Sequence, residues 1–387
     1  MTPLRVAYVT DQLLPSDATD TAQTMAMCAA LGALDDVALT LVAPAHPRLR
    51  DVSALAAHYG VASTFSLAPL PGPYPAPLGL RGLEKVAHAR NAARWLRDHA
   101  IDLVYTRNLP AVWATLSRTD MPVVYETYRP WPEQSRFKRL LFTRLRRRER
   151  LVGLVLHSRL AAESYAWLGF SPERLMVAHN AIDPAPFLNP LSPREARTRL
   201  GLPLDGPLVV YTGHVSPDKG LDLVLDAAER LPSVRFALVG SSGQGPIERR
   251  AAALSNVRVV GWQSANVVPI WLMAADILVI PPTSRPLLKV GNTVLPIKTF
   301  QYLAAGRAIV APRTPDLCEV LDDRNAVLVP PDDREAFITA LTWLCAEPGR
   351  AATLGDQARR GALDRTWDRR ARAVADFFRS RLDKGVR

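Results

Sequence analysis

Short apolar, β-rich runs alternate with helix-length segments along the whole chain, and this alternation constrains the fold more than any other feature. The runs lie at 5–10, 37–44, 101–106, 122–127, 153–158 and 176–183 in the first half, and at 208–213, 234–240, 258–262, 276–282 and 308–312 in the second. Strands that alternate with helices predict parallel sheets covered by helices on both faces. Because 387 residues exceed the size at which one core stops growing, we expect two doubly wound α/β domains.

A proline-dense segment divides the two halves. We expect an N-terminal domain over residues 1–185, a linker or hinge over 186–207 and a second domain over 208–365. The basic, amphipathic segment 366–387 is expected to form a helix that crosses back to the N-terminal domain. Since ligands of such sheets bind at the carboxyl ends of the strands, we expect the ligand site in a cleft between the domains.

The composition limits the cellular compartments and the binding partners that we expect for this chain. Three widely spaced cysteines exclude a disulfide framework and suit a reducing compartment. No signal segment precedes the first strand-like run, and no apolar run approaches the roughly 20 residues that span a bilayer, so we expect a cytoplasmic protein. The net charge of +11 favours nucleic acid, acidic membrane or phosphorylated ligands, although an arginine-rich composition alone would give the same charge. Motifs of nucleic-acid binding are missing, and we expect no nucleic-acid partner.

The segment 295–312, LPIKTFQYLAAGRAIVAP, predicts a short helix followed at once by a buried strand. Pro296 suits the first turn of a helix, where a missing N–H costs nothing, and Gly306 suits the position just past the end. Lys298 and Gln301 lie one turn apart near the free N–H groups of that helix. A surface helix would carry them by chance, whereas a helix that receives an anion would carry them for a reason.

A second strand–loop–helix unit, YTGHVSPDKGLDLVLDAAERL at 211–231, offers a similar opportunity. A phosphate could lie against the free N–H groups near Gly220, with Lys219 as a mobile charge beside it. Taken alone, the segment also fits an ordinary connection with a solvated lysine. The run GSSGQG at 240–245 does not match G-x-G-x-x-G, so it indicates a nucleotide-cofactor oxidoreductase only weakly.

These segments in their order, with VRFALVG, RVVGW and TPDLCEVLDDRNAVLVPPDDREAFITAL, resemble the donor half of retaining GT-B glycosyltransferases of family four. In the first half, VAYVTDQLLPSDATDTAQTMAMCAAL, VVYETYRPWP and VAHNAID resemble acceptor-side landmarks of the same family. The resemblance implies a GT-B fold of two Rossmann-like domains with an interdomain cleft. It also implies a UDP- or GDP-sugar donor, a hydroxyl acceptor in polysaccharide or glycolipid assembly, and neither cofactor nor metal.

The resemblance assigns roles on the donor side. It implies that the diphosphate is held by Gly213, His214, Lys219, Ile297 and Lys298, the ribose by Gln301, the donor sugar by Asn292, Thr293 and Val294, and the base near Gly240, Gly261 and Trp262. Gln301 and Thr293 stand where the family usually has glutamates. These departures leave open a weakly active or inactive protein that still binds a nucleotide sugar.

On the acceptor side, the resemblance implies catalytic roles for Glu126 and Tyr128 beside Lys219, and an acceptor loop with Ser16, Asp17 and Thr19. Tyr128 occupies a position where the family often has histidine. A phenol with a pKa near 10 is a poor general base, but it can hydrogen-bond a sugar. Glu126 could either bind an acceptor hydroxyl or be a buried, paired structural carboxylate.

The segment 135–150, SRFKRLLFTRLRRRER, predicts a helix with a basic face beside an apolar one. Such a helix can lie on an anionic membrane, which would suit a lipid-linked or carbohydrate acceptor and a peripheral location on the inner face of the membrane. Equally, the apolar face could pack on the protein's own sheet and leave the arginines in water.

Overall fold

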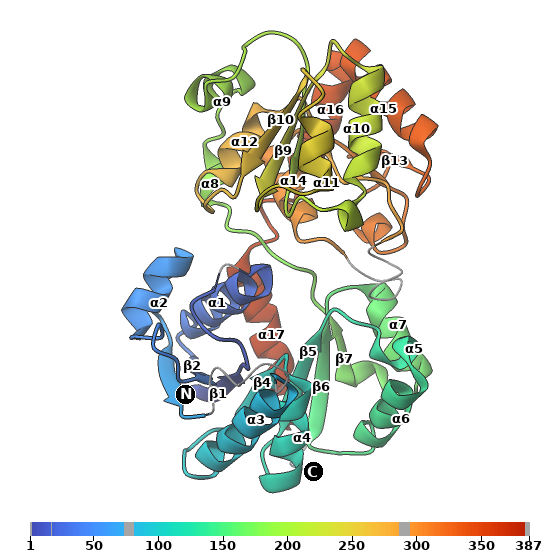
Figure 1. The fold of residues 1–387 in the computed structure, drawn as a ribbon. Helices are drawn as coiled ribbons and strands as arrows, with labels where there is room; N and C mark the ends of the chain where they lie inside the picture. The colour runs from blue at the N-terminus through green and yellow to red at the C-terminus, as the bar shows by residue number, and fades with distance from the viewer. Residues whose placement is uncertain (1, 17, 73–80, 286–294, 384–387) are drawn as a thin grey trace. The chain divides into compact units, whose positions relative to one another are not determined.

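The computed structural model describes residues 2–16, 18–72, 81–285 and 295–383. Contacts divide the chain into two compact units. Unit 1 comprises residues 1–179 and 367–387, and unit 2 comprises residues 180–366. Each unit is built around a parallel sheet (Figure 1).

The sheet of unit 1 has the strand order β3-β2-β1-β4-β5-β6-β7 among the described residues. Its strands are β1 (Leu4–Val9), β2 (Val37–Pro44), β3 (Ser66–Leu70), β4 (Leu103–Thr106), β5 (Val123–Thr127), β6 (Leu151–Leu156) and β7 (Leu175–Val177). All adjacent pairs are parallel, with Val6 opposite Leu39 on one side and Leu103 on the other. The order reverses at β1, so the loop that follows β1 lies at the switch point where such sheets bind ligands.

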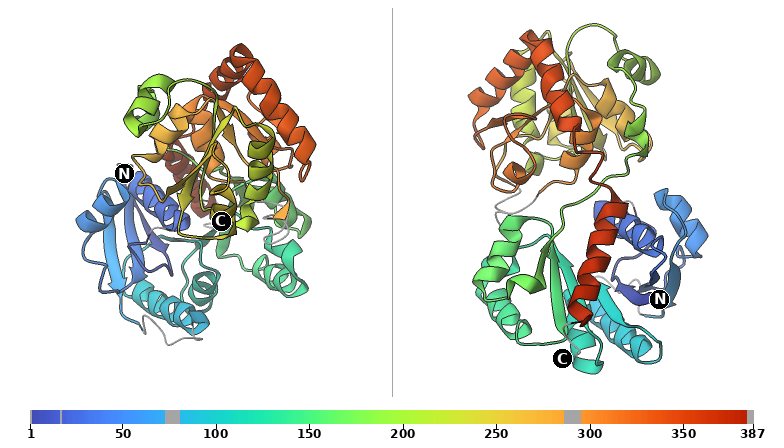
Figure 2. Two further views of the ribbon diagram at one scale, coloured as in Figure 1. Left: turned by 45° about the horizontal axis from the view of Figure 1, so that its top comes forward. Right: turned by 180° about the vertical axis from the view of Figure 1, so that it is seen from behind.

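Helices cover both faces of this sheet because successive strand residues point in opposite directions. The helices are α1 (Thr19–Gly32), α2 (Val52–Tyr59), α3 (Arg81–Arg97), α4 (Leu109–Arg118), α5 (Trp131–Gln134), α6 (Arg136–Leu145), α7 (Arg159–Trp167), the 3₁₀ turn η1 (Pro172–Arg174) and α17 (Trp367–Leu382). Val6 and Tyr8 pack in a core with α1, α2 and α17, and Ala7 and Val9 pack in a core with α3, α4, α6 and α7. The C-terminal α17 lies beside α1 (Figure 2).

Unit 2 repeats the architecture with the strand order β10-β9-β8-β11-β12-β13. Its strands are β8 (Leu208–Thr212), β9 (Arg235–Ser241), β10 (Val257–Gly261), β11 (Ile277–Val279), β12 (Ala308–Pro312) and β13 (Val327–Val329). All described pairs are parallel. Here the strand order reverses at β8, which lies between β9 and β11, so the loops after β8 and β11 flank the switch point.

Helices again form two layers in unit 2. They are α8 (Ala185–Leu188), α9 (Pro193–Leu200), α10 (Leu221–Arg230), α11 (Pro246–Ala251), α12 (Val268–Ala274), α14 (Lys298–Ala305), α15 (Arg334–Ala346) and α16 (Pro348–Arg359), with the 3₁₀ turns η2 (Pro217–Lys219) and η3 (Leu317–Glu319). Val210 packs in a core with α9, α12 and α14, and Val209 and Tyr211 pack in a core with α10, α11 and α15.

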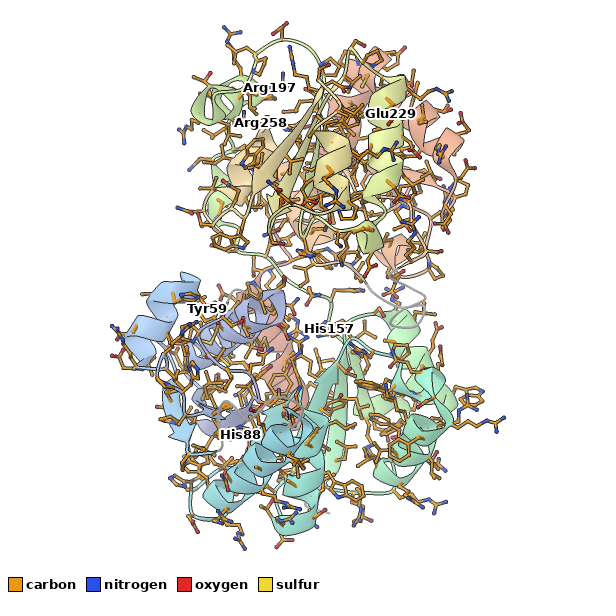
Figure 3. The ribbon with its side chains drawn as sticks, in the orientation of Figure 1. Tyr59, His88, His157, Arg197, Glu229 and Arg258 are labelled. Atoms are coloured by element: carbon orange, nitrogen blue, oxygen red, sulfur yellow. The ribbon has the colours of Figure 1, made fainter. Side chains whose placement is uncertain are left out.

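The segment expected as a linker, 186–207, is instead an ordered part of unit 2. Ser192 and Glu195 form a capping box at the start of α9, and Pro193 occupies its first turn. The buried Arg197 then donates to the carbonyl of Ala274 at 3.0 Å and to the carboxylate of Asp276 at 2.5 Å (Figure 3). The contact boundary accordingly falls between residues 179 and 180, before the expected position.

No helix within the described parts of the chain is both long enough and apolar enough to cross a bilayer.

Candidate functional site

The carboxyl ends of β8, β11 and β12 surround a cavity of about 120 Å³ in unit 2. Lys219 and Pro296 line it together with Lys298, and Tyr211 and Thr314 add an aromatic ring and a hydroxyl. The lysine after the first strand of the unit and the lysine of the Pro296 helix therefore share one cavity. Its place at the switch point is the position where doubly wound sheets hold nucleotides.

The ammonium of Lys298 occupies the centre of this arrangement. It lies 3.8 Å from the centroid of the Tyr211 ring, a cation–π contact. The residue as a whole is half-buried, but burial of its ammonium, together with the nearby positive charge of Lys219, lowers the pKa of Lys298 to about 7. Two ammonium groups thus share one cavity and repel each other, which is the electrostatic condition that a bound dianion would relieve.

Two glycines make this close approach feasible. Gly213 has a φ of +132°, and a Cβ there would lie 2.7 Å from Nζ of Lys298. Gly240, at φ +115°, would place a Cβ 2.5 Å from the carbonyl oxygen of Gly213. Glycine at both positions therefore leaves room for the lysine and for the contact between the ends of β8 and β9.

The turn that carries Lys219 is fixed by Arg285, a residue that follows β11. Arg285 donates to the carbonyl of Pro217 at 3.1 Å and makes a bidentate ion pair with Asp222 at 2.8 Å. Lys219 itself is exposed, and it forms no ion pair with any residue within the described ranges. The arginine thus holds the turn while the lysine ammonium stays available to a ligand. Sequence reasoning missed Arg285 because its partners are more than 60 residues away.

The remaining donor-side candidates lie around this cavity or at the neighbouring strand ends. Helix α14 begins after Ile297 without a side-chain cap. The N–H groups of Thr299 and Phe300 donate to the carbonyls of Pro296 and Ile297, each at 3.1 Å, so the N–H groups of Ile297 and Lys298 are the ones that a ligand would receive. Gln301 is half-buried one turn after Lys298. His214 is exposed, and its carbonyl accepts a hydrogen bond from the Tyr211 hydroxyl at 3.0 Å.

The base candidates lie at the ends of the adjacent strands: Gly240 is the next-to-last residue of β9 and Gly261 the last of β10, and Trp262 follows with 62% of its surface exposed. The donor-sugar candidates Asn292, Thr293 and Val294 lie outside the described residues.

In unit 1, Glu126 at the carboxyl end of β5 is buried within a network of polar partners. Its carboxylate accepts from Nε2 of His157 at 2.6 Å, from Arg370 at 2.9 Å and from the Tyr105 hydroxyl. Although burial alone would raise the pKa of Glu126, Arg370 and the hydrogen bond from His157 hold it well below its usual value. Of the two roles left open for Glu126, the geometry fits the paired structural carboxylate, since its oxygens are engaged and 3% of the residue is exposed.

His157, which follows β6, is the residue of this edge that sequence reasoning missed (Figure 3). Burial lowers the pKa of His157 to about 4, so the imidazole is neutral at pH 7. Because Glu126 is ionised, the proton of the neutral ring belongs on Nε2. The ring centroid of Tyr128 lies 6.2 Å away. A histidine near the end of the predicted strand run at 153–158 was a visible signal, because carboxyl ends of neighbouring parallel strands share one edge.

The acceptor-loop candidates lie after β1, at the switch point of unit 1. The backbone N–H of Ser16 donates to the Tyr59 hydroxyl at 2.7 Å, and that hydroxyl donates back to the carbonyl of Ser16 at 2.9 Å (Figure 3). Thr19 is exposed at the start of α1, and Asp17 lies outside the described residues. The loop is therefore anchored on α2 by its backbone.

Within the described ranges no cluster of three or more histidine, cysteine, aspartate or glutamate residues is arranged to hold a metal ion.

Comparisons with known proteins agree with this architecture. Residues 23–186 match the model of glycosyltransferase family 4, and residues 206–347 match that of glycosyl transferases group 1. D-inositol 3-phosphate glycosyltransferase of Xylanimonas cellulosilytica is 32% identical over 241 residues, which are 58% of this chain and 56% of that protein. The enzyme of the same name from Streptomyces bingchenggensis is 28% identical over 228 residues, 54% of this chain and 48% of that protein. The chain thus aligns with about half the length of the curated relatives it matches.

Solved structures share the fold over nearly the whole chain. Sucrose-phosphate synthase from Thermosynechococcus elongatus superposes with a TM-score of 0.77 at 17% identity, covering 97% of this chain and 98% of that one. Anabaena HepE in complex with UDP-glucose gives 0.72 at 16% identity, covering 97% and 100%. With a matching family model in each half and two Rossmann-like units throughout, the chain belongs to the group 1 and family 4 glycosyltransferases of GT-B fold.

Proposed function

We propose that the protein transfers a sugar from a nucleotide-diphosphate sugar to a hydroxyl group of an acceptor. The observation that carries the proposal is the shared cavity of Lys219 and Lys298, two cations that repel each other at the switch point of a nucleotide-binding type of sheet. A diphosphate supplies the negative charge that this cavity lacks. The uncapped start of α14 and the start of α10 add oriented N–H groups to the two lysines.

The chemistry follows from charge. An acceptor hydroxyl attacks the anomeric carbon while the bond from that carbon to the β-phosphate oxygen breaks, and the leaving diphosphate takes both the electron pair and the acceptor's proton. Lys219, Lys298 and the helix starts stabilise the charge that develops on the leaving group. We propose that the transfer needs no metal ion and retains the anomeric configuration.

The rest of the donor fits around the diphosphate. Gln301 lies one turn along α14 from Lys298, where its amide would hydrogen-bond the ribose. Gly213 and His214 would contact the phosphates, and Ile297 would donate its backbone N–H. The base would lie at the ends of β9 and β10, near Gly240, Gly261 and Trp262, where UDP and GDP remain the two candidates. Asn292, Thr293 and Val294 would contact the sugar.

Unit 1 supplies the acceptor side in this proposal. Tyr128 is half-buried beside His157 at the carboxyl edge of the sheet, so its hydroxyl would orient an acceptor hydroxyl. Glu126 would act through His157 by fixing its tautomer and orientation. The loop with Ser16, Asp17 and Thr19, which follows β1, would bind further hydroxyl groups of a carbohydrate acceptor.

We also propose that the protein works in the cytoplasm on the surface of an anionic membrane. Helix α6 divides its apolar residues: Phe142 and Leu145 are buried in unit 1, whereas Phe137 is 75% exposed and Leu140 is 49% exposed. Trp167 of α7 is 70% exposed, and the guanidinium of Arg139 lies 5.1 Å from its ring centroid. Exposed apolar groups among arginines are typical of a surface that enters a lipid interface.

The test is binding and turnover with a panel of UDP- and GDP-sugars. A ligand at about 100 times its dissociation constant stabilises its protein by roughly 2.7 kcal/mol, so the true donor should raise the melting temperature clearly. Lys219→Ala should remove most of this shift, while Lys85→Ala, a change to an exposed lysine of α3, should not. If no nucleotide sugar shifts the melting temperature, the diphosphate assignment fails.

The alternative is a protein that binds the donor without transferring it, because Gln301 and Thr293 replace the usual glutamates. Hydrolysis or transfer of a radiolabelled sugar separates the two. A donor-dependent thermal shift without any release of labelled sugar would support the alternative. Loss of turnover on addition of EDTA, or a product of inverted configuration, would contradict the proposed mechanism.

A further inference from the structure

Another pair of cations lies in unit 1, around Trp131, and it has no carboxylate partner in the part of the chain that the structure describes. We call it the Trp131 cluster and define it as Tyr128, Arg129, Trp131 and Lys138. The guanidinium of Arg129 lies 5.3 Å from the ring centroid of Tyr128 and 5.0 Å from that of Trp131. The ammonium of Lys138 lies 3.8 Å from the Trp131 ring centroid. Two cations are thus gathered on one indole.

Hydrogen bonds to strand β5 and helix α7 fix the position of the cluster. The carbonyl of Arg129 accepts from the Tyr165 hydroxyl at 2.8 Å, and its backbone N–H donates to the Thr127 hydroxyl at 3.0 Å. The Trp131 indole N–H donates to the Tyr125 hydroxyl at 2.9 Å. Because Thr127 and Tyr125 belong to β5, the cluster is fixed at the carboxyl edge of the sheet, where Tyr128 lies beside His157. Side chains that are positioned in advance lose little freedom when they bind a ligand.

Each of the two cations uses one of its hydrogen-bond donors within the protein, which leaves other donors for a ligand. Arg129 uses its Nε to donate to the Tyr128 hydroxyl at 3.1 Å, and Lys138 donates to the amide oxygen of Gln134 at 3.0 Å. Among the described residues, neither cation has a carboxylate within ion-pair distance. Burial lowers the pKa of Lys138, and the positive charge of Arg129 lowers it further, so the two charges act on each other. The terminal nitrogens of Arg129 have no hydrogen-bond partner among the residues that the structure describes, and such a guanidinium beside an ammonium is a typical phosphate-binding pair.

We propose that the Trp131 cluster binds an anionic group of the acceptor, and that the acceptor is therefore a phosphorylated sugar, polyol or lipid-linked sugar rather than a neutral one. The inference rests on the proposed function, because it assigns the substrate class on the acceptor side. Arg129 and Lys138 hold the phosphate, and the Trp131 and Tyr128 rings border the attached carbon skeleton. The acceptor's hydroxyl is then directed along the sheet edge toward Tyr128.

The first experiment titrates inorganic phosphate calorimetrically into protein saturated with UDP, so that the donor cavity is occupied, and in parallel into the Lys298→Ala variant. We expect one phosphate site in both. Arg129→Gln and Lys138→Gln should each weaken it by about tenfold or more, the factor that one lost charged contact represents. Arg129→Lys should retain part of the binding. Arg136→Gln, a change to an exposed arginine two residues before Lys138, is the matched control and should bind as the wild type does.

Phosphate binding that is unchanged in Arg129→Gln and Lys138→Gln, or absent from the wild type, overturns the proposal. Lys138 is half-buried and its ammonium pairs with no carboxylate among the described residues, so its variant should fold even if Arg129→Gln does not. The UDP-glucose thermal shift is read in the same samples. A normal shift with no phosphate site contradicts only this inference, whereas a phosphate site with no UDP-glucose shift contradicts only the donor proposal.

The second experiment compares transfer to neutral acceptors with transfer to their monophosphates. We expect turnover with the monophosphates, and an increase in KM with little change in kcat in Lys138→Gln, because the cluster holds a part of the acceptor remote from the reacting hydroxyl. Equal turnover of both forms contradicts the proposal. If Arg129→Gln instead lowers binding to phosphatidylglycerol vesicles while the phosphate titration is flat in all variants, the cluster serves the membrane and the proposal is wrong.

Discussion

Lys219 and Lys298 line the same cavity of unit 2, and burial together with the charge of Lys219 lowers the pKa of Lys298 to about 7. Each lysine comes from a different strand–helix connection, one following β8 and one preceding β12. Their mutual repulsion is present before any ligand binds. An anion that binds between them therefore gains both the attraction of two cations and the removal of their repulsion.

We first predict that affinity for UDP-glucose falls as the pH rises above 7. Its diphosphate stays fully ionised over this range, so the titrating group is Lys298, which binds the ligand when protonated. Because the bound diphosphate raises the pKa of this lysine, affinity should decrease by up to about tenfold per pH unit between the free and bound pKa values. Titration calorimetry from pH 6.5 to 9 measures this pH dependence of the affinity. Lys298→Met should bind weakly with a flat profile, and a wild-type profile that is equally flat would contradict the assignment.

The same lysine should destabilise the unliganded protein. The folded-state pKa of Lys298, about 7, lies below the ordinary lysine value of 10.5, so the unfolded chain binds more protons between these values. Its contribution to the free energy of unfolding is therefore least favourable below pH 7 and improves toward pH 10.5. We predict that Lys298→Met raises the melting temperature of the ligand-free protein at pH 6.5 and changes it less at pH 9. A variant that melts lower than the wild type at pH 6.5 would show that the cation–π contact with Tyr211 outweighs the burial cost.

Glu126 and Arg370 provide a prediction on stability. Arg370→Met leaves the buried Glu126 without its cation, and removing one member of a buried pair costs about 3–5 kcal/mol of unfolding free energy. The matched control is Arg372→Met on the same helix, because Arg372 pairs with Asp36 at the surface and such a pair contributes about 1 kcal/mol or less. Urea unfolding monitored by circular dichroism measures both.

The pH dependence of this network has the opposite sign from that of Lys298. Because the pKa of Glu126 is held well below 4.5, its stabilising contribution is present above pH 4.5 and is lost as the pH falls through the folded-state pKa. Equal losses of stability in Arg370→Met and Arg372→Met would contradict the buried network. Donor binding, which we propose for unit 2, should survive in both variants.

Much of the fold was visible in local patterns. Strand β12 has the predicted bounds of 308–312, and Gly306 ends α14 with a φ of +65°, as its place in the sequence indicated. Strand β3 was missed because it is an edge strand that contains Pro69 and carries no continuous apolar run. Proline is tolerated at an edge, so its presence hid the strand rather than excluding it.

Tertiary partners could not be predicted from spacing. The 186–207 segment was interpreted as a linker from its prolines, but the buried Arg197 finds its carboxylate at Asp276. Glu126 meets Arg370, 244 residues later, through a helix that packs beside α1. Sequence reasoning could place Glu126 at a strand end, and only the packing of α17 showed that its oxygens are engaged.

The last prediction concerns the exposed face of α6 and α7. Each arginine close to anionic lipid contributes about 1 kcal/mol, and the exposed Phe137, Leu140 and Trp167 add apolar burial at the interface. The wild type should therefore sediment with phosphatidylglycerol vesicles and far less with phosphatidylcholine vesicles, and added salt should weaken the binding. Phe137→Glu should reduce it about tenfold or more, since the change removes an apolar anchor and adds a repelled charge. Trp343→Glu, at a 41% exposed tryptophan of α15, is the matched control and should sediment like the wild type. Equal binding to both vesicles, or equal loss in both variants, would show that the arginines of this helix are merely solvated.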